Sequence, residues 1–401
     1  MKRILFVDDE AKILDGLCRS LRNLRGEWEM AYAEGGVAAL RQCACRPFDV
    51  VVSDARMPGM EGSEFLGKVR KLYPDTVRII LSGQCSRNSV LKCVGVAHQF
   101  LSKPCDPGTL RLAVQKVCRI RDSFHDGPMR EAISCIQWLP SQAHLYQELA
   151  DQIESPTPSI ERVAGVIARD VGMSAKVVQL VSSGFFGTPQ RLSSVAHAAK
   201  LLGLETLKAI FVFSSAFQSG CENSWEEDLQ LLAAHSFAVA EAARGIAETL
   251  TDDRALIGDA YLAGVLHEVG RLALTCRNDL CCAGANATRN ANGPNGPSPD
   301  ADANKAEPDP GGYLAALWGL PDPVVQAIAY HRVPSGCPEP SSIPLTAVHV
   351  AHAFLERPKD AAEEAVGRLL DMAYLRAVGC AEHMGGWREK CHASHSTGVP
   401  Q

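Results

Sequence analysis

The sequence predicts an α/β domain with a parallel sheet, followed by an all-α half. Three short apolar runs, 4–7, 50–52 and 79–81, each end on a polar residue. A strand buried on both faces of a parallel sheet has this unbroken apolar pattern. After about residue 125 no alternating strand pattern of useful length occurs, and apolar residues recur at helical spacing instead.

Polar side chains close the predicted strands of the N-terminal part. Because the carboxyl ends of parallel strands meet at one edge of a sheet, these side chains are expected to lie together. Three carboxylates gathered there make a hard oxygen site suited to Mg²⁺. In chain order, the residues at the strand ends are Asp8, Asp9, Asp54, Ser82 and Lys103.

Residues 1–122 resemble a response-regulator receiver domain. The resemblance rests on this order of polar residues and on the stretch Asp54–Gly62, which fits the family's D-x-x-M-P-x-M-x-G pattern. It implies a flavodoxin-like fold, with a doubly wound, five-stranded parallel sheet, in which Asp54 accepts a phosphoryl group. It also implies that Mg²⁺ is held by Asp8, Asp9, Asp54 and the backbone of Arg56, that Ser82 and Lys103 contact the phosphoryl group, and that Phe100 is the switch aromatic.

Each implied role has a chemical reason. A carboxylate is a poor nucleophile toward an anionic phosphoryl donor unless a metal offsets the negative charges. A lysine supplies a compact positive charge for Asp54 and later for the phosphoryl oxygens. Taken singly, the Asp8–Asp9 pair would cap the next helix and Lys103 would be a solvated surface residue. The five positions together favour the receiver.

Composition agrees with a soluble, cytoplasmic regulator. The formal charge is −6 and no Lys/Arg block occurs, so no direct nucleic-acid binding is expected. The apolar run 4–7 is too short for a signal peptide or a membrane span. The 15 cysteines are scattered and are expected to be reduced thiols that act as small apolar residues.

The second half, residues 141–385, resembles the HDOD output domains after a linker at 123–140. The resemblance rests on the stretches Asp170–Gly187, Val195–Leu204 and Gly264–Arg271, and on two later ones, Leu317–Pro321 and Ile328–His331. HDOD domains are relatives of the HD phosphohydrolases and of the HD-GYP cyclic-dinucleotide phosphodiesterases. The stretch 281–312, rich in Ala, Asn, Gly, Pro and Asp, is predicted to be a flexible insertion, and 386–401 a disordered tail.

The resemblance also implies a metal site that this chain keeps only in part. HD hydrolases hold one or two divalent ions with His and Asp from several helices. Glu268 stands where the HD pair has its Asp, and Arg332 stands where a second His is expected. These departures favour a catalytically silent domain in which the histidines are satisfied interior residues. The alternative is that the histidines bind one transition-metal ion. The candidate residues are His235, His267, Glu268, His331 and His352.

We therefore predict a two-component response regulator whose phosphorylated receiver controls a non-catalytic HDOD domain. A sensor histidine kinase or phosphotransfer protein would supply the phosphoryl group to Asp54, and a downstream signalling protein or a homodimer would receive the signal. One alternative is a receiver-gated, metal-dependent phosphodiesterase acting on cyclic di-GMP or a related phosphodiester. Another is a domain that keeps a nucleotide pocket without turnover.

Overall fold

The computed structural model describes residues 1–83, 92–124, 126–136, 138–183, 191–213, 217–219, 226–275, 308–340, 342–356 and 369–397. The chain divides into two compact units. One comprises Met1–Gly220 with Tyr313–Asp322, and the other Cys221–Gly312 with Pro323–Gln401. No helix in the described part of the chain is both long enough and apolar enough to cross a membrane.

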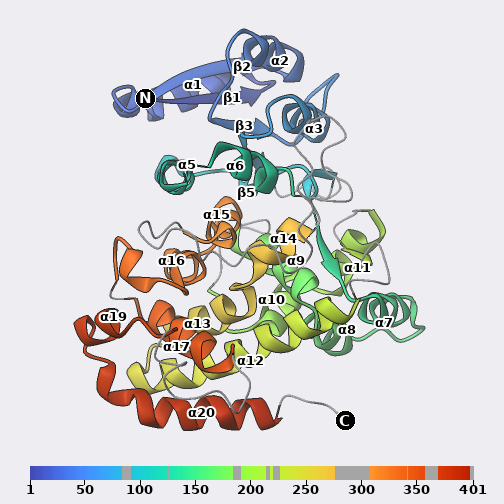
Figure 1. The fold of residues 1–401 in the computed structure, drawn as a ribbon. Coiled ribbons are helices and arrows are strands. Elements are labelled where there is room, and N and C mark those ends of the chain that lie inside the picture. The colour runs from blue at the N-terminus through green and yellow to red at the C-terminus, as the bar shows by residue number, and fades with distance from the viewer. Residues whose placement is uncertain are drawn as a thin grey trace. The chain divides into compact units, whose positions relative to one another are not determined.

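The N-terminal part of the first unit is built on a five-stranded parallel sheet (Figure 1). The strands lie in the order β2-β1-β3-β4-β5, as in the flavodoxin-like arrangement that the sequence predicted. All four neighbouring pairs are parallel. The strands are β1 (Lys2–Asp8), β2 (Trp28–Glu34), β3 (Val50–Asp54), β4 (Val77–Ser82) and β5 (Gln99–Ser102).

Helices cover the sheet, which explains the unbroken apolar runs. The side chains of Ile4, Leu5 and Phe6 are fully buried although neighbours along a strand point to opposite faces. Helix α1 packs on β1 and β2, and α2 packs beside α3 (Figure 1). The helices around this sheet include α1 (Ala11–Ser20), α2 (Gly36–Cys45), α3 (Gly62–Leu72) and α5 (Pro107–Ser123).

The segment predicted as a linker, 123–140, contains an ordered helix, α6 (Gly127–Ser134). Asp126 caps this helix by accepting a hydrogen bond from the backbone N–H of Met129, and Ser134 at its end is buried. Directly after it, β6 (Leu139–Ser141) pairs in parallel with β7 (Phe217–Ser219). The second half is largely helical, as the sequence predicted, and this pair of three-residue strands is the exception in its described residues.

The rest of the first unit consists of helices from the second half of the sequence. The stripe Leu145, Leu149 and Ile153 is buried along one helix, as its spacing predicted. Every residue of α9 is buried, and Asp170 caps that helix at the backbone N–H of Met173. The helices are α7 (Ala143–Glu154), α8 (Ile160–Ile167), α9 (Val171–Ser182), α10 (Val195–Leu202) and α11 (Leu204–Phe213).

The second unit is helical in its described residues. Helices α12, α13 and α17 pack on one another, and α20 packs on α12 and α17. Helix α15 (Pro310–Leu317) begins in the second unit and belongs to the first from Tyr313 onward. The other helices are α12 (Glu226–Leu250), α13 (Arg254–Leu266), α14 (Val269–Thr275), α16 (Asp322–Tyr330), α17 (Ile343–Leu355), α19 (Met372–Ala377) and α20 (Met384–Thr397).

Two predictions about disorder need correction. The expected tail at 386–401 is helical up to Thr397, and residues 398–401 lie outside the described part. Trp387 of this helix is only 2% exposed and donates a hydrogen bond to Thr249 Oγ1 at 2.8 Å. The predicted insertion 281–312 lies mostly outside the described residues, but its last residues begin α15.

Gly264 allows α13 to approach α12 closely. A Cβ built on Gly264 would lie 2.4 Å from the Cα of Ala240, which is closer than atoms can pack. We expect Gly264→Ala to destabilise the helical half by about 1–3 kcal/mol, because the two helix backbones must separate. The matched control is Gly245→Ala on α12, where a Cβ meets nothing within 4 Å.

The control substitution is expected to leave stability unchanged or to raise it by up to about 1 kcal/mol, since alanine favours helix. Thermal unfolding followed by circular dichroism compares the two variants. Equal unfolding temperatures would contradict the close helix approach.

Candidate functional site

The first site lies at the carboxyl edge of the parallel sheet, where Lys103 joins two acids. Its Nζ lies 2.6 Å from Asp8 Oδ2 and 2.5 Å from Asp54 Oδ1. Asp8 ends β1, Asp54 ends β3, and Lys103 directly follows β5. The parallel sheet therefore brings together three residues that are far apart in the sequence.

Backbone groups fix both carboxylates of this pocket. The N–H of Arg56 donates to Asp54 Oδ2 at 2.8 Å, and the N–H of Glu10 donates to Asp8 Oδ1 at 3.0 Å. The N–H of Lys103 donates to the carbonyl of Ser82 at 2.6 Å, which ties the ends of β4 and β5 together. Each acid is thus held by one backbone donor and by the lysine.

Electrostatics keep Lys103 charged in this pocket. Burial alone would lower its pKa, but its hydrogen bonds to Asp54 and Asp8 and their charges outweigh burial and raise the pKa. A charged lysine between two carboxylates offsets most of the repulsion between them. The pocket is therefore an ordered anionic site with one fixed cation.

The other predicted receiver residues are placed in different ways. Ser82 and Phe100 are buried on the neighbouring strands β4 and β5, and the Lys103–Pro104 peptide bond is cis. Asp9 is exposed and lies outside the Lys103 cluster of ion pairs. Of Arg56, it is the backbone N–H that contacts Asp54.

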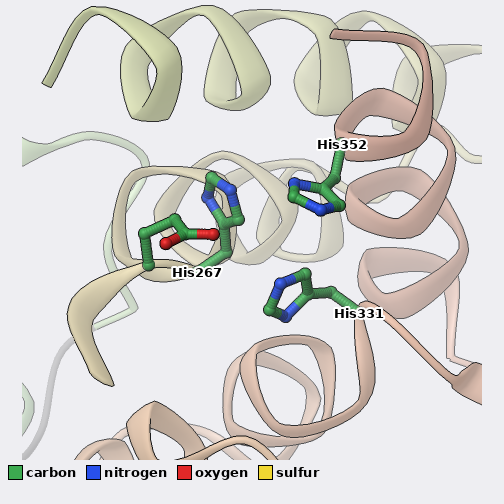
Figure 2. Close-up of side chains that lie close together, drawn as sticks. His267, His331 and His352 are labelled. Carbon is green, nitrogen blue, oxygen red and sulfur yellow. The ribbon is translucent and has the colours of Figure 1, made fainter. Parts of the chain in front are cut away.

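The second site is a cluster of four histidines in the second unit. His235 Nε2 lies 3.3 Å from His267 Nε2 and 3.4 Å from His352 Nδ1. The ring of His331 completes the group, with its centroid 4.9 Å from that of His352 and 5.1 Å from that of His267. Figure 2 shows the rings of His267, His331 and His352 turned toward one another.

Two backbone carbonyls fix the orientation of the rings. His267 Nδ1 donates to the carbonyl of Gly264 at 2.7 Å, and His331 Nδ1 donates to that of Ile328 at 2.9 Å. Because a carbonyl only accepts, Nδ1 of each ring carries the hydrogen and Nε2 keeps its lone pair. Metal-ligating histidines are commonly oriented by this kind of outer hydrogen bond.

Burial keeps the clustered histidines neutral. It lowers the pKa of His267 to about 4 and lowers the pKa values of His331 and His352 well below the usual range. Burial also lowers the pKa of His235, although Glu356 opposes the shift. Neutral imidazoles can offer lone pairs, which is the form that binds a metal.

The carboxylate of Glu268 forms ion pairs with two arginine side chains. Its Oε1 lies 2.7 Å from the guanidinium of Arg332, and its Oε2 lies 3.5 Å from that of Arg271. Burial would raise its pKa, but His267 and the two arginines lower it to about 2, so the carboxylate is ionised. Arg332 Nε also donates to His331 Nε2 at 3.3 Å. Arg332 therefore engages the lone pair of His331 Nε2 that a metal would otherwise use.

The spacing of the ring nitrogens matches a metal site. Nitrogen ligands about 2.0–2.1 Å from a tetrahedral ion lie about 3.3–3.4 Å apart. His235, His267 and His352 show this separation in the two distances given above. A single N–H on His235 cannot point at both of the other nitrogens at once. Among the described residues, two groups have possible ligand atoms within 4.8 Å of one another: His267, Glu268, His331 and His352, and His235, His352 and Glu356.

Sequence reasoning missed two residues of this cluster. Glu356 Oε2 lies 3.6 Å from His235 Nε2 and 3.8 Å from His352 Nδ1, at the exposed edge of the group. Its position four residues after His352 places it on the same helical face, which was an available signal. Arg271 lies three residues after Glu268, which is the other spacing that brings helical side chains together, so a signal for this pair was also available.

Two family models match the chain. The response regulator receiver domain matches residues 4–115, and the HDOD domain matches residues 139–334. The chain belongs to the response regulators. Its receiver precedes an HDOD domain, as the sequence predicted.

Known proteins resemble parts of this response regulator. HoxA of Cupriavidus necator, a hydrogenase transcriptional regulatory protein, is 30% identical over 45% of this chain and 39% of its own length. RpfG of Xanthomonas campestris, a cyclic di-GMP phosphodiesterase response regulator, is 27% identical over 44% of this chain and 52% of its own. The chain therefore spans well under two thirds of either relative.

Among solved structures, the response regulator TrrA of Thermotoga maritima in complex with Mg(2+)-BeF is 34% identical. The match covers 29% of this response regulator and 98% of TrrA, with a TM-score of 0.27.

Proposed function

We propose that Asp54 accepts a phosphoryl group and that the phosphorylated receiver controls a non-catalytic HDOD domain. The observation that carries the proposal is the pocket in which Lys103 joins Asp8 and Asp54 at the carboxyl edge of the sheet. A buried carboxylate held by a backbone N–H and beside a fixed cation is oriented for attack on an anionic donor. A receiver requires a phosphodonor, and a sensor histidine kinase or phosphotransfer protein is the proposed one.

The pocket also fits a divalent cation. Receiver domains bind Mg²⁺. The carboxylates of Asp8 and Asp54 are the hard oxygen donors that this ion prefers, and Asp9 directly follows Asp8 in the sequence. When bound, Mg²⁺ offsets negative charge during phosphoryl transfer. Lys103 holds an oxygen of each buried acid, so the lysine and the cation would share the same two carboxylates.

Phosphorylation by a small donor tests the receiver half of this proposal. Incubation of the full chain with acetyl phosphate and Mg²⁺ is expected to add one phosphoryl group per chain, measured by intact mass. Chelation of Mg²⁺ with EDTA is expected to abolish the addition, because Asp54 then faces the anionic donor without a metal. Absence of phosphorylation with Mg²⁺ present would contradict the proposal.

In the HDOD domain we propose one bound transition-metal ion without hydrolysis. Support comes from the neutral ring nitrogens of His235, His267 and His352, two pairs of which lie 3.3–3.4 Å apart. It also comes from the group His267, Glu268, His331 and His352, whose possible ligand atoms lie within 4.8 Å of one another. The ion pairs of Glu268 argue against catalysis, because its two oxygens face Arg332 and Arg271. A carboxylate paired in this way is a poor second ligand, and the arginines add positive charge where a second ion would sit.

The second candidate function is a metal-dependent phosphodiesterase, as the name of RpfG describes for that protein. The convergence of four histidines favours it, because HD hydrolases also place histidines from several helices around an ion. A cyclic di-GMP hydrolysis assay with Mn²⁺ or Fe²⁺, with and without acetyl phosphate, distinguishes a phosphodiesterase from a metal-binding domain without hydrolysis. We expect no turnover in either state, and turnover that His267→Ala abolishes would make the domain an enzyme.

A further inference from the structure

The strands that carry the phosphorylation pocket also contact the HDOD segments of the first unit. Ser82 ends β4 and Lys103 directly follows β5 at the carboxyl edge. Arg78 and Gln99, four residues earlier in each case, lie near the opposite ends of the same two strands. At about 3.3 Å per residue, roughly 13 Å separates the pocket from these contacts.

Helix α6 is fixed to the beginning of the two strands. The guanidinium of Arg78 donates to the carbonyl of Ser134 at 2.5 Å, and His98 Nε2 lies 2.9 Å from the same oxygen. His98 Nδ1 accepts the backbone N–H of Arg78, and its Nε2 also lies 2.7 Å from Arg78 Nη2. Ser134 is the last residue of α6, where helix carbonyls carry partial negative charge.

Helix α9 of the HDOD domain holds the segment that leads into β5. Lys176 Nζ donates to the carbonyl of Val94 at 3.0 Å, and Gln179 Nε2 donates to that of His98 at 3.2 Å. The two side chains lie three residues apart and so on one face of the helix. Gln179 Oε1 is buried and accepts no hydrogen bond from the described residues, which leaves this contact incompletely satisfied.

Segment 313–322 contacts β5 and α5 of the receiver. Gln99 Nε2 donates to the carbonyl of Ala316 at 3.1 Å. Lys116 of α5 donates to the carbonyl of Leu320 and pairs with Asp322 Oδ1 at 2.7 Å. Gln99 is 3% exposed, so its hydrogen bond is shielded from water.

We propose that α9 and segment 313–322 restrain the receiver through the beginning of β4 and β5, and that phosphorylation of Asp54 weakens this contact. The inference rests on the proposed function of Asp54 and adds the route and the sign of control. The contact includes side chains from α9, so the signal passes directly into the HDOD domain and not only along the connecting segment.

The sign follows from the two ends of the strands. A phosphoryl group adds negative charge and three acceptor oxygens beside Lys103 and Ser82, and so draws the carboxyl ends of β4 and β5 toward Asp54. Close-packed strands transmit small shifts because the core does not compress. The contacts at the opposite ends are single hydrogen bonds at 3.0–3.2 Å, and a shift of about 0.5 Å takes such a bond beyond useful range.

Binding equilibria for beryllofluoride with Mg²⁺, a phosphoryl mimic, test the inference on the full chain. Gln99→Met and Lys116→Met each remove a donor to segment 313–322 and keep most of the side-chain volume. Coupling is reciprocal, so both variants should bind beryllofluoride more tightly, by about two- to tenfold, the range for one lost hydrogen bond. The matched control is Gln115→Met on the same helix, whose partner Glu27 belongs to the receiver, and its affinity should equal that of the wild type.

The outcomes are distinguishable. Tighter binding by Gln99→Met and Lys116→Met, with faster amide exchange of residues 313–322 in both variants, supports the restraint. Equal affinity in all four proteins, or weaker binding by the two variants, overturns the restraint and leaves phosphorylation of Asp54 intact. A wild-type chain that does not bind beryllofluoride overturns the proposed function of Asp54. The proposed restraint by α9 and segment 313–322 falls with it.

Discussion

Asp54→Asn is expected to reduce phosphorylation by acetyl phosphate to background. The nucleophile is a carboxylate oxygen, and the neutral amide of asparagine does not supply one. The shape of the side chain is kept, so the backbone N–H of Arg56 can still find an oxygen acceptor. Loss of phosphorylation then reports the chemistry of this residue and not a collapse of the pocket. Intact-mass measurement after incubation with acetyl phosphate and Mg²⁺ gives the result.

The matched control is Asp15→Asn on the exposed face of α1. This variant loses the same charge at a position remote from Lys103, and it should be phosphorylated like the wild type. Equal phosphorylation of Asp54→Asn and the wild type would place the acceptor at another residue. The assignment of the pocket would then be wrong.

The purified full chain is expected to carry about one transition-metal ion in its HDOD domain, and His267→Ala is expected to lose it. His267 supplies a lone pair held in place by the carbonyl of Gly264. Loss of an outer partner of a ligand alone costs about 10- to 100-fold in metal affinity, so loss of the ligand itself should cost at least as much. Elemental analysis after dialysis against Zn²⁺ or Mn²⁺ measures the metal content.

His197→Ala is the matched control for the metal experiment. His197 lies on α10 of the other unit and contacts Ser193 Oγ at 3.1 Å. Its removal should leave the metal content unchanged. A wild-type chain that binds no metal under these conditions would return the four residues to the role of interior histidines, and equal metal content in His267→Ala would exclude His267 as a ligand.

The buried strands of the receiver were predictable from their apolar runs, and its fold from the resemblance to receiver domains. Runs such as 4–7 and 50–52 are apolar on both faces, and only a covered parallel sheet requires that pattern. The strand pair β6–β7 was not predictable, since three residues including Pro140 are too few for a period. Helix α20 was missed because Gly385 and Gly386 suggest a break. The spacing of the buried Trp387 and Cys391, four residues apart, was the signal for it.

The candidate sites were predictable as residue types but not as geometry. The sequence indicates His235, His267, His331 and His352 one at a time, whereas only the fold brings two pairs of nitrogens to 3.3–3.4 Å. The pairing of Arg332 with Glu268 depends on how α16 meets the end of α13, which no local pattern encodes. Contacts such as Gln99 with Ala316 join a side chain to a distant carbonyl, and a carbonyl has no sequence signature.

The most direct test of phosphorylation control is amide hydrogen exchange on the full chain, with and without acetyl phosphate and Mg²⁺. Asp54→Asn treated in the same way is the control. We predict that phosphorylation speeds exchange in α9 and in residues 313–322 of the wild type and leaves the variant unchanged. Changes confined to residues 4–115 would contradict control of the HDOD domain by the receiver.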